Sequence, residues 1–154
     1  MYRIVLDTVV FVRALIPLAT TGDYRNPRSV SGRLLSDEAE RFTLLVSKPT
    51  AQELLEVIQR PELTRKYRSL GRISVQQVID LLARAELVDI GAPSPVVRDP
   101  KDDIFVATAI AGQADFIVSE DKDLLDLKDV SGIPIMDTRA FTERLSAKRE
   151  TGRS

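Results

Sequence analysis

The chain has 154 residues, of which 44% are hydrophobic and 29% are charged, and its formal net charge is −1. These values fit one soluble globular domain, and they exclude a disordered chain and capture of nucleic acid by the charge of the whole molecule. Cys and His are both missing, which excludes disulfides, thiolate zinc sites and Ser-His-Asp or Cys-His catalysis.

No feature of the sequence predicts contact with a membrane. No apolar run reaches the roughly 20 residues that cross a bilayer. The chain begins directly with a strand-like segment after Met1, without the pattern of a secretory signal. A cytoplasmic protein is therefore expected.

Short apolar runs rich in β-branched residues predict five strands. They lie at residues 3–6, 42–47, 86–90, 115–119 and 133–136. A loop at 17–32 follows the first strand and its apolar continuation.

Helical patterns separate the later strands. They cover residues 33–42, 50–59, 60–72, 74–87, 102–113 and 137–149. Thr50 with Glu53, and Ser74 with Gln77, have the capping-box spacing that marks a helix start.

Alternating strands and helices predict a three-layer α/β fold with a mainly parallel sheet. We expect one domain over residues 1–147 and a polar, frayed tail over residues 148–154.

One acid, Asp7, interrupts the apolar run RIVLDTVVFV at residues 3–12. An ionised carboxylate taken out of water is costly unless another group neutralises its charge. Because neither a cap nor a turn obviously requires an acid between these apolar stretches, Asp7 predicts a functional group.

Other acids lie at comparable places, where sites form beyond the carboxyl ends of parallel strands. Asp121 and Asp123 follow the strand at 115–119, and Glu53 lies in the first turn of the helix after the strand at 42–47. Three more acids stand where the helix near residue 102 begins: Asp99, Asp102 and Asp103.

Most of these acids also have a purely structural interpretation. Glu53 would complete the capping box that starts at Thr50. Asp102 and Asp103 suit the positive end of a helix dipole, and the two acids after the fourth strand suit a turn. Their coincidence at strand ends favours one shared site.

Clustered carboxylates repel one another and take up protons unless a cation neutralises them. An all-oxygen site without His or Cys suits a hard cation, Mg²⁺ or Mn²⁺. Such an ion lowers the pKa of a bound water and stabilises charge on a phosphate. The acids therefore predict phosphodiester hydrolysis without histidine.

Four segments, IVLDT with VFV, QELLEVIQRPEL, RDPKDDIFVATAIAGQADFIVS and SEDKDLL, together resemble the PIN-domain nucleases. The resemblance is to the group known as toxin components of bacterial toxin–antitoxin pairs, and it runs from about residue 2 to residue 143. It implies a PIN-like α/β/α fold with about five strands and a metal-dependent endoribonuclease that uses Mg²⁺ or Mn²⁺.

The resemblance also implies roles for particular residues. The four catalytic, metal-binding acids of the family fall on Asp7, Glu53, Asp102 and Asp121. The further metal ligands are Asp103 and Asp123, and the residues that support the acids are Thr8, Ser119 and Asp99.

The chain departs from the family at one position, because Val9 stands where the family usually has Asn after Asp-Thr. An Asn amide would steady the acids by hydrogen bonding, which Val cannot do. One hypothesis is therefore an active ribonuclease toxin, and the alternative is a weak or inactive PIN-like module that binds RNA or a partner protein. A third, phosphoryl transfer on Asp7, requires either a second acid at the position of Val9 or a well-placed Lys and hydroxyl set.

RNA binding requires basic side chains along the phosphate backbone. The predicted contacts to single-stranded RNA are Arg13, Arg60, Arg65, Lys66 and Arg68. The alternative for this basic run is a solvated helix face.

The resemblance further implies a small antitoxin partner and a homodimer. The helix at 74–87 offers an apolar face for such a contact, unless this face belongs to the core. The face is formed by Val75, Val78, Ile79 and Leu82.

Overall fold

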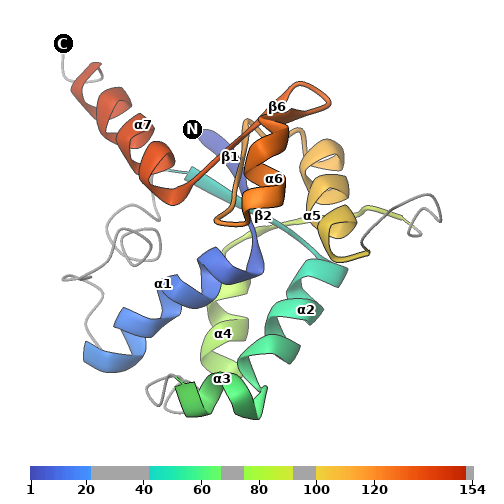
Figure 1. Ribbon diagram of the computed structural model, residues 1–154, viewed down its shortest axis with the longest axis vertical. Coiled ribbons are helices and arrows are strands. Elements are labelled where there is room, and N and C mark those ends of the chain that lie inside the picture. The colour runs from blue at the N-terminus through green and yellow to red at the C-terminus, as the bar shows by residue number, and fades with distance from the viewer. Residues whose placement is uncertain (22–41, 67–74, 92–99, 152–154) are drawn as a thin grey trace.

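The computed structural model describes residues 1–21, 42–66, 75–91 and 100–151, and these residues form a mixed α/β fold (Figure 1). Within them, six strands make one sheet in the order β3-β2-β1-β4-β6-β5. The strands are β1 Tyr2–Leu6, β2 Phe42–Ser47, β3 Glu86–Val88, β4 Phe116–Val118, β5 Asp129–Val130 and β6 Ile133–Met136. Neighbouring strands are parallel except β5, which is antiparallel to β6.

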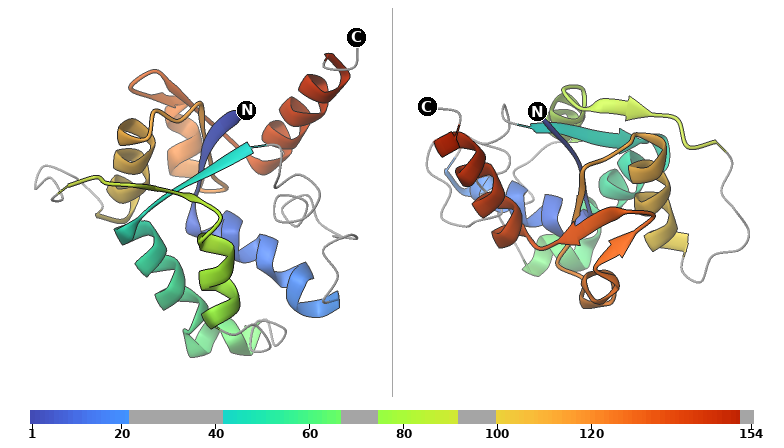
Figure 2. Two further views of the ribbon diagram at one scale, coloured as in Figure 1. Left: turned by 180° about the vertical axis from the view of Figure 1, so that it is seen from behind. Right: turned by 90° about the horizontal axis from the view of Figure 1, so that it is seen from above.

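Helices cover both faces of this sheet (Figures 1 and 2). They are α1 Thr8–Thr21, α2 Lys48–Ile58, α3 Pro61–Lys66, α4 Val75–Leu82, α5 Pro100–Ala111, α6 Lys122–Leu127 and α7 Thr138–Thr151. In the described ranges, no helix combines the length and the apolar character needed to cross a membrane.

Alternate residues of β1 enter two separate hydrophobic cores, which confirms the three layers. Ile4 and Leu6 pack in a core with side chains of α1, α2, α4 and α7. Val5, between them, packs in the second core with side chains of α5 and α6. This alternation is the period of two that a strand imposes on its side chains.

All five predicted strands are present, and the short antiparallel β5 was not predicted. The predicted start of the second-strand helix at Thr50 is wrong. Ser47 is the N-cap of α2, and its capping box is closed by Thr50 rather than by Glu53. Pro49 is compatible with this earlier start, because N–H groups in the first turn of a helix have no acceptor within the helix and the N–H that proline lacks is not needed there.

Other elements also differ from the predictions: α1 was not predicted as a helix, α4 ends at Leu82 rather than at residue 87, and α5 begins at Pro100 rather than at residue 102. α1 continues to Thr21, into the predicted loop; α6 forms where only a turn was expected; and α7 continues to Thr151, into the predicted tail. The predicted helix at 33–42 and the predicted capping box of Ser74 lie outside the described residues.

The apolar face of α4 is divided between core and surface. Val78 is fully buried, and Leu82 packs against the same core. Val75 and Ile79 are 38% and 41% exposed. The core interpretation therefore holds for half of this face.

Candidate functional site

Three parallel neighbours, β2, β1 and β4, place the residues after their carboxyl ends at one edge of the sheet. α1 begins after β1, α2 begins after β2, and Ser119 follows β4. α5 leads by a short connection into β4 and packs against β1, β2 and α2, so its first turn lies toward the same edge. The backbone thus brings the four acid-bearing segments together.

Asp7 is 6% exposed and lies directly before α1. Its Oδ1 accepts a hydrogen bond from the backbone N–H of Val10 at 2.8 Å, which is the geometry of a helix N-cap. Its Oδ2 accepts a hydrogen bond from the hydroxyl of Ser119. The expectation that no cap requires this acid is wrong, because Asp7 caps α1.

Burial raises the pKa of Asp7 above its ordinary value. Hydrogen bonds from the Ser119 hydroxyl and from the backbone N–H groups of Val10 and Glu120 act in the opposite direction. The negative charge of Glu120 raises the pKa further. Asp7 is thus a buried acid whose pKa is raised by burial, and neighbouring hydrogen-bond donors offset part of this effect.

Thr8, the residue that follows Asp7 in the chain, contacts Glu53 of α2. The Thr8 hydroxyl donates to Glu53 Oε2 at 2.5 Å. Glu53 is half-buried in α2 and takes no part in the capping box of that helix. Thr8 therefore links the segment after β1 to the acid of α2.

Asp121 is joined to Asp7 by a shared serine. The Asp121 backbone N–H donates to Ser119 Oγ at 3.0 Å, and the same hydroxyl donates to Asp7. The Asp121 carboxylate caps α6 by accepting from the Asp123 N–H at 2.9 Å. Both Asp121 and Asp123 are exposed.

The remaining predicted acids are only partly described. Asp99 lies outside the described residues, whereas Asp102 and Asp103 lie in the first turn of α5 and their side chains lie outside the described part of the structure. Among the acids whose side chains are described, no three lie close enough together to hold a metal ion.

Three of the five predicted RNA contacts lie on two helices, α1 and α3, and Arg60 lies between α2 and α3. Arg13 is exposed on α1, and Arg65 and Lys66 are exposed at the end of α3. Arg60 donates to Glu56 at 3.0 Å, so one of its contacts is an ion pair within the chain. Arg68 lies outside the described residues.

The sequence analysis missed a buried hydroxyl network between α5 and α2. Thr108 of α5 lies with its Oγ1 2.7 Å from Ser47 Oγ and 2.6 Å from the carbonyl of Ile104. Thr50 Oγ1 accepts from the Ser47 N–H at 2.8 Å and donates to the Ser47 carbonyl at 3.0 Å. A hydroxyl at the end of a buried strand, followed three residues later by another, was the available signal.

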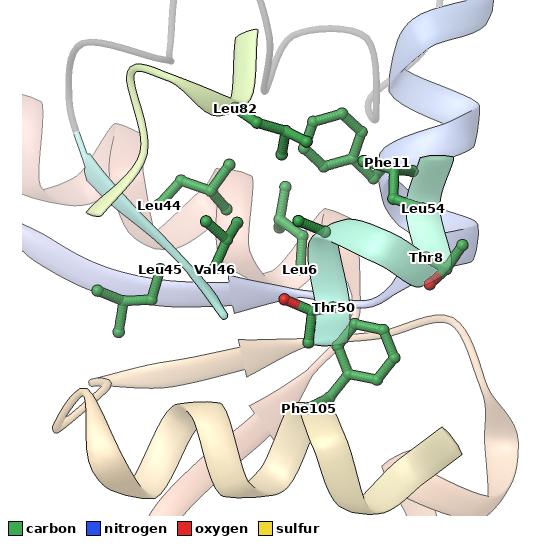
Figure 3. A pocket seen from close by; sticks show the side chains of 11 residues that line it. Leu6, Thr8, Phe11, Leu44, Leu45, Val46, Thr50, Leu54, Leu82 and Phe105 are labelled. Carbon is green, nitrogen blue, oxygen red and sulfur yellow. The ribbon is translucent and has the colours of Figure 1, made fainter. Parts of the chain in front are cut away.

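A small apolar pocket lies beside this network, lined by Thr8, Thr50, Phe105 and neighbouring Leu side chains (Figure 3). Its volume of about 20 Å³ is room for one water molecule. A nucleotide does not fit there, so this pocket is not a substrate site.

Comparison with known proteins agrees with this architecture. No curated protein matches the chain. The crystal structure of VapBC2 from Rickettsia felis, bound to a DNA fragment from its promoter, is similar in fold, with a TM-score of 0.53 and 15% identity over 88% of this chain and 98% of that one. PAE2754 from Pyrobaculum aerophilum has a TM-score of 0.53 and 17% identity over 95% of this chain and 90% of that one.

At these identities the two structures show a common fold and nothing more. The family profile of the PIN domain matches residues 3–123, which is most of the chain and contains Asp7, Glu53, Asp102 and Asp121. The chain therefore belongs to the PIN domain family.

Proposed function

We propose that this protein is an endoribonuclease that hydrolyses phosphodiester bonds of single-stranded RNA with a divalent cation, Mg²⁺ or Mn²⁺. The observation that carries the proposal is Asp7, a buried acid at the carboxyl edge of the sheet that is joined through Ser119 to the backbone of Asp121 and whose neighbour Thr8 donates to Glu53. Membership of the PIN domain family supports the same chemistry.

The donor chemistry of these residues fits a hard cation. Every candidate ligand is a carboxylate, which is the ligand type that hard cations such as Mg²⁺ and Mn²⁺ prefer. The residues that would hold the ion are Asp7, Glu53, Asp102 and Asp121, with Asp103 and Asp123 beside them. When bound, such an ion supplies an activated water and stabilises charge on the phosphate oxygens.

The chain's own hydroxyls orient the acids. Ser119 and Thr8 donate to Asp7 and Glu53, so each acid presents its remaining lone pairs in a fixed direction. Hydrogen-bonded supports of this kind preserve the geometry of a metal site.

The basic side chains favour a polymeric substrate. Thr8, next to Asp7, contacts Glu53 in the middle of α2, and from Glu53 to the end of the helix at Ile58 the distance is about 8 Å at a rise of ~1.5 Å per residue. Arg65 and Lys66 lie on α3, beyond the end of α2 that is remote from Asp7 (Figure 1). An RNA strand that extends along this half of α2 would contact both the acids and these basic side chains.

We also propose a role as the toxin of a cytoplasmic toxin–antitoxin pair. The fold similarity to the VapBC2 structure supports this role. The expected antitoxin is a small protein that covers the acidic edge, and a homodimer would use the exposed Val75 and Ile79 of α4.

Cleavage of single-stranded RNA by the purified protein tests the proposal. Asp7→Asn is expected to abolish cleavage in Mn²⁺, because it removes the charge and keeps an oxygen that can accept from Val10 N–H. Asp80→Asn on α4 is the matched control, since it removes the charge of an exposed acid and keeps its hydrogen bond from Gln76. Cleavage that continues in excess chelator would refute the metal mechanism.

A second candidate function, RNA or partner binding without turnover, is favoured by one observation. Val9 is 50% exposed next to Asp7 and Thr8, so the site has an apolar surface where the family usually has an amide. Because this side chain is outside the core, Val9→Asn is expected to fold normally. Cleavage gained by Val9→Asn supports an intact but weakened nuclease, whereas RNA binding without cleavage in both proteins supports the binding module.

A further inference from the structure

We infer that Glu120 is a positioning residue of this site, whose carboxylate fixes the segment that holds Asp7 to the N-terminus of α7. The inference rests on the proposed function and adds a residue that the sequence analysis did not select. It follows from the hydrogen bonds on either side of Glu120.

Three consecutive residues, Ser119 to Asp121, surround Asp7 from the β4 side. The Ser119 hydroxyl donates to the Asp7 carboxylate, and the Glu120 backbone N–H lies close enough to lower the pKa of Asp7. The Asp121 N–H then donates to the Ser119 oxygen at 3.0 Å, which fixes the direction of that hydroxyl. A shift of this short connection would therefore move the Ser119 hydroxyl, the Glu120 N–H and the Asp121 acid together.

The Glu120 side chain attaches this connection to a rigid element. Its Oε1 accepts a hydrogen bond from the backbone N–H of Thr138 at 3.0 Å. Thr138 is the first residue of α7 and is 2% exposed. α7 is anchored in the core by the fully buried Phe141 and by Leu145.

A helix N-terminus suits this attachment because its first N–H groups lack acceptors within the helix. Asp137 satisfies another of these groups, the N–H of Ala140, at 2.8 Å. Glu120 is thus one of two acids on the α7 N-terminus, and it is the one whose backbone N–H also lies close to Asp7.

Two substitutions separate positioning from charge. Glu120→Gln keeps an oxygen that can accept from Thr138 N–H and removes the charge. Glu120→Asp keeps the charge and withdraws the acceptor by one methylene. If Glu120 acts by position, Glu120→Gln keeps the activity of the site and Glu120→Asp reduces it. If Glu120 acts by its charge or as a metal ligand, Glu120→Gln reduces the activity more than Glu120→Asp does.

Two controls share the surroundings of Glu120. Thr138→Val removes a buried hydroxyl that has no hydrogen-bond partner in the described part of the chain, and it keeps the N–H that donates to Glu120. Asp137→Ala removes the other acid on α7 and leaves Glu120 in place.

The experiment measures kcat and KM on single-stranded RNA at saturating Mn²⁺, together with amide hydrogen exchange at Glu120 and Asp121. Glu120→Asp is expected to lower kcat by about 10-fold or more with little change in KM, and to speed exchange at both amides. Glu120→Gln and both controls are expected to stay within about threefold of the wild type, because supports of a metal site act mainly through geometry.

Three outcomes would overturn the inference. They are wild-type behaviour of Glu120→Asp, a kcat loss in Glu120→Gln as large as in Glu120→Asp, and an equal loss in Asp137→Ala. If the wild-type protein does not cleave RNA, the proposed function fails, and the exchange rates still decide whether Glu120 holds the segment.

Discussion

The buried contact between Thr108 and Ser47 gives the sharpest prediction of stability. Both side chains are fully buried, and they join α5 to the N-cap of α2. Because the Thr108 hydroxyl donates to the Ile104 carbonyl, the proton between Thr108 and Ser47 comes from Ser47. Thr108→Val nearly preserves the shape of the side chain and removes the acceptor for that proton.

The expected cost of Thr108→Val is about 1 kcal/mol in the free energy of unfolding, because the buried Ser47 hydroxyl loses its acceptor at 2.7 Å and is left with Thr50 Oγ1 at 3.3 Å. Ser47→Ala costs about 1 kcal/mol through loss of the N-cap of α2, in addition to this contact. The double variant is expected to lose about 1 kcal/mol less than the sum of the two single losses, because both partners of one hydrogen bond are then gone.

Urea denaturation of the wild type, the two single variants and the double variant measures this coupling, with the midpoint and slope followed separately. For a chain of this size, each kcal/mol also lowers the melting temperature by about 2–4 °C. Losses that add to within about 0.5 kcal/mol would show that the two hydroxyls do not interact.

The remaining predictions concern Asp7. Burial raises the pKa of Asp7 in the folded state, so the folded protein binds the carboxyl proton more tightly than the unfolded chain does. The stability that this protonation contributes is present below the ordinary pKa of 3.8 and is lost as the pH rises through the folded-state pKa. The wild type is therefore expected to lose stability relative to Asp7→Asn over that range in metal-free urea titrations, and parallel pH curves would contradict this. In thermal scans, added Mn²⁺ is expected to raise the melting temperature of the wild type more than that of Asp7→Asn, because a ligand that binds only the folded state stabilises that state. Equal shifts in the two proteins would argue against Asp7 as a metal ligand.

The strands were predictable because their signal is local and strong. Runs such as FTLLVS and FIVS are apolar and rich in β-branched residues, which suits a sheet covered on both faces. β5 has only two residues and forms by pairing with β6, so its own sequence carries little information.

Helix starts were harder to predict, because several polar side chains competed for the same role. Thr50 and Glu53 have the spacing of a capping box, yet Ser47 and Thr50 form the actual box one turn earlier. Asp7 was hidden as a cap because the apolar Val9 and Val10 that follow it resemble a continued strand.

The order of the elements predicted that the segments converge at the site, but it did not predict the side-chain contacts within the site. A parallel sheet brings the segments after β1, β2 and β4 to one edge whatever the details of their side chains. The link from Glu120 to α7 depends on a hydrogen bond across 18 positions of the sequence, for which no local pattern exists.

Calorimetric titration of Mn²⁺ into the wild type and into Asp102→Asn tests most directly the claim that acids from separate segments share one cation. The wild type is expected to bind Mn²⁺, and the variant is expected to bind it at least about 10-fold more weakly, with Asp80→Asn unchanged, because hard cations depend on carboxylate ligands. Absence of binding by the wild type, or equal affinity in Asp102→Asn, would contradict the shared site.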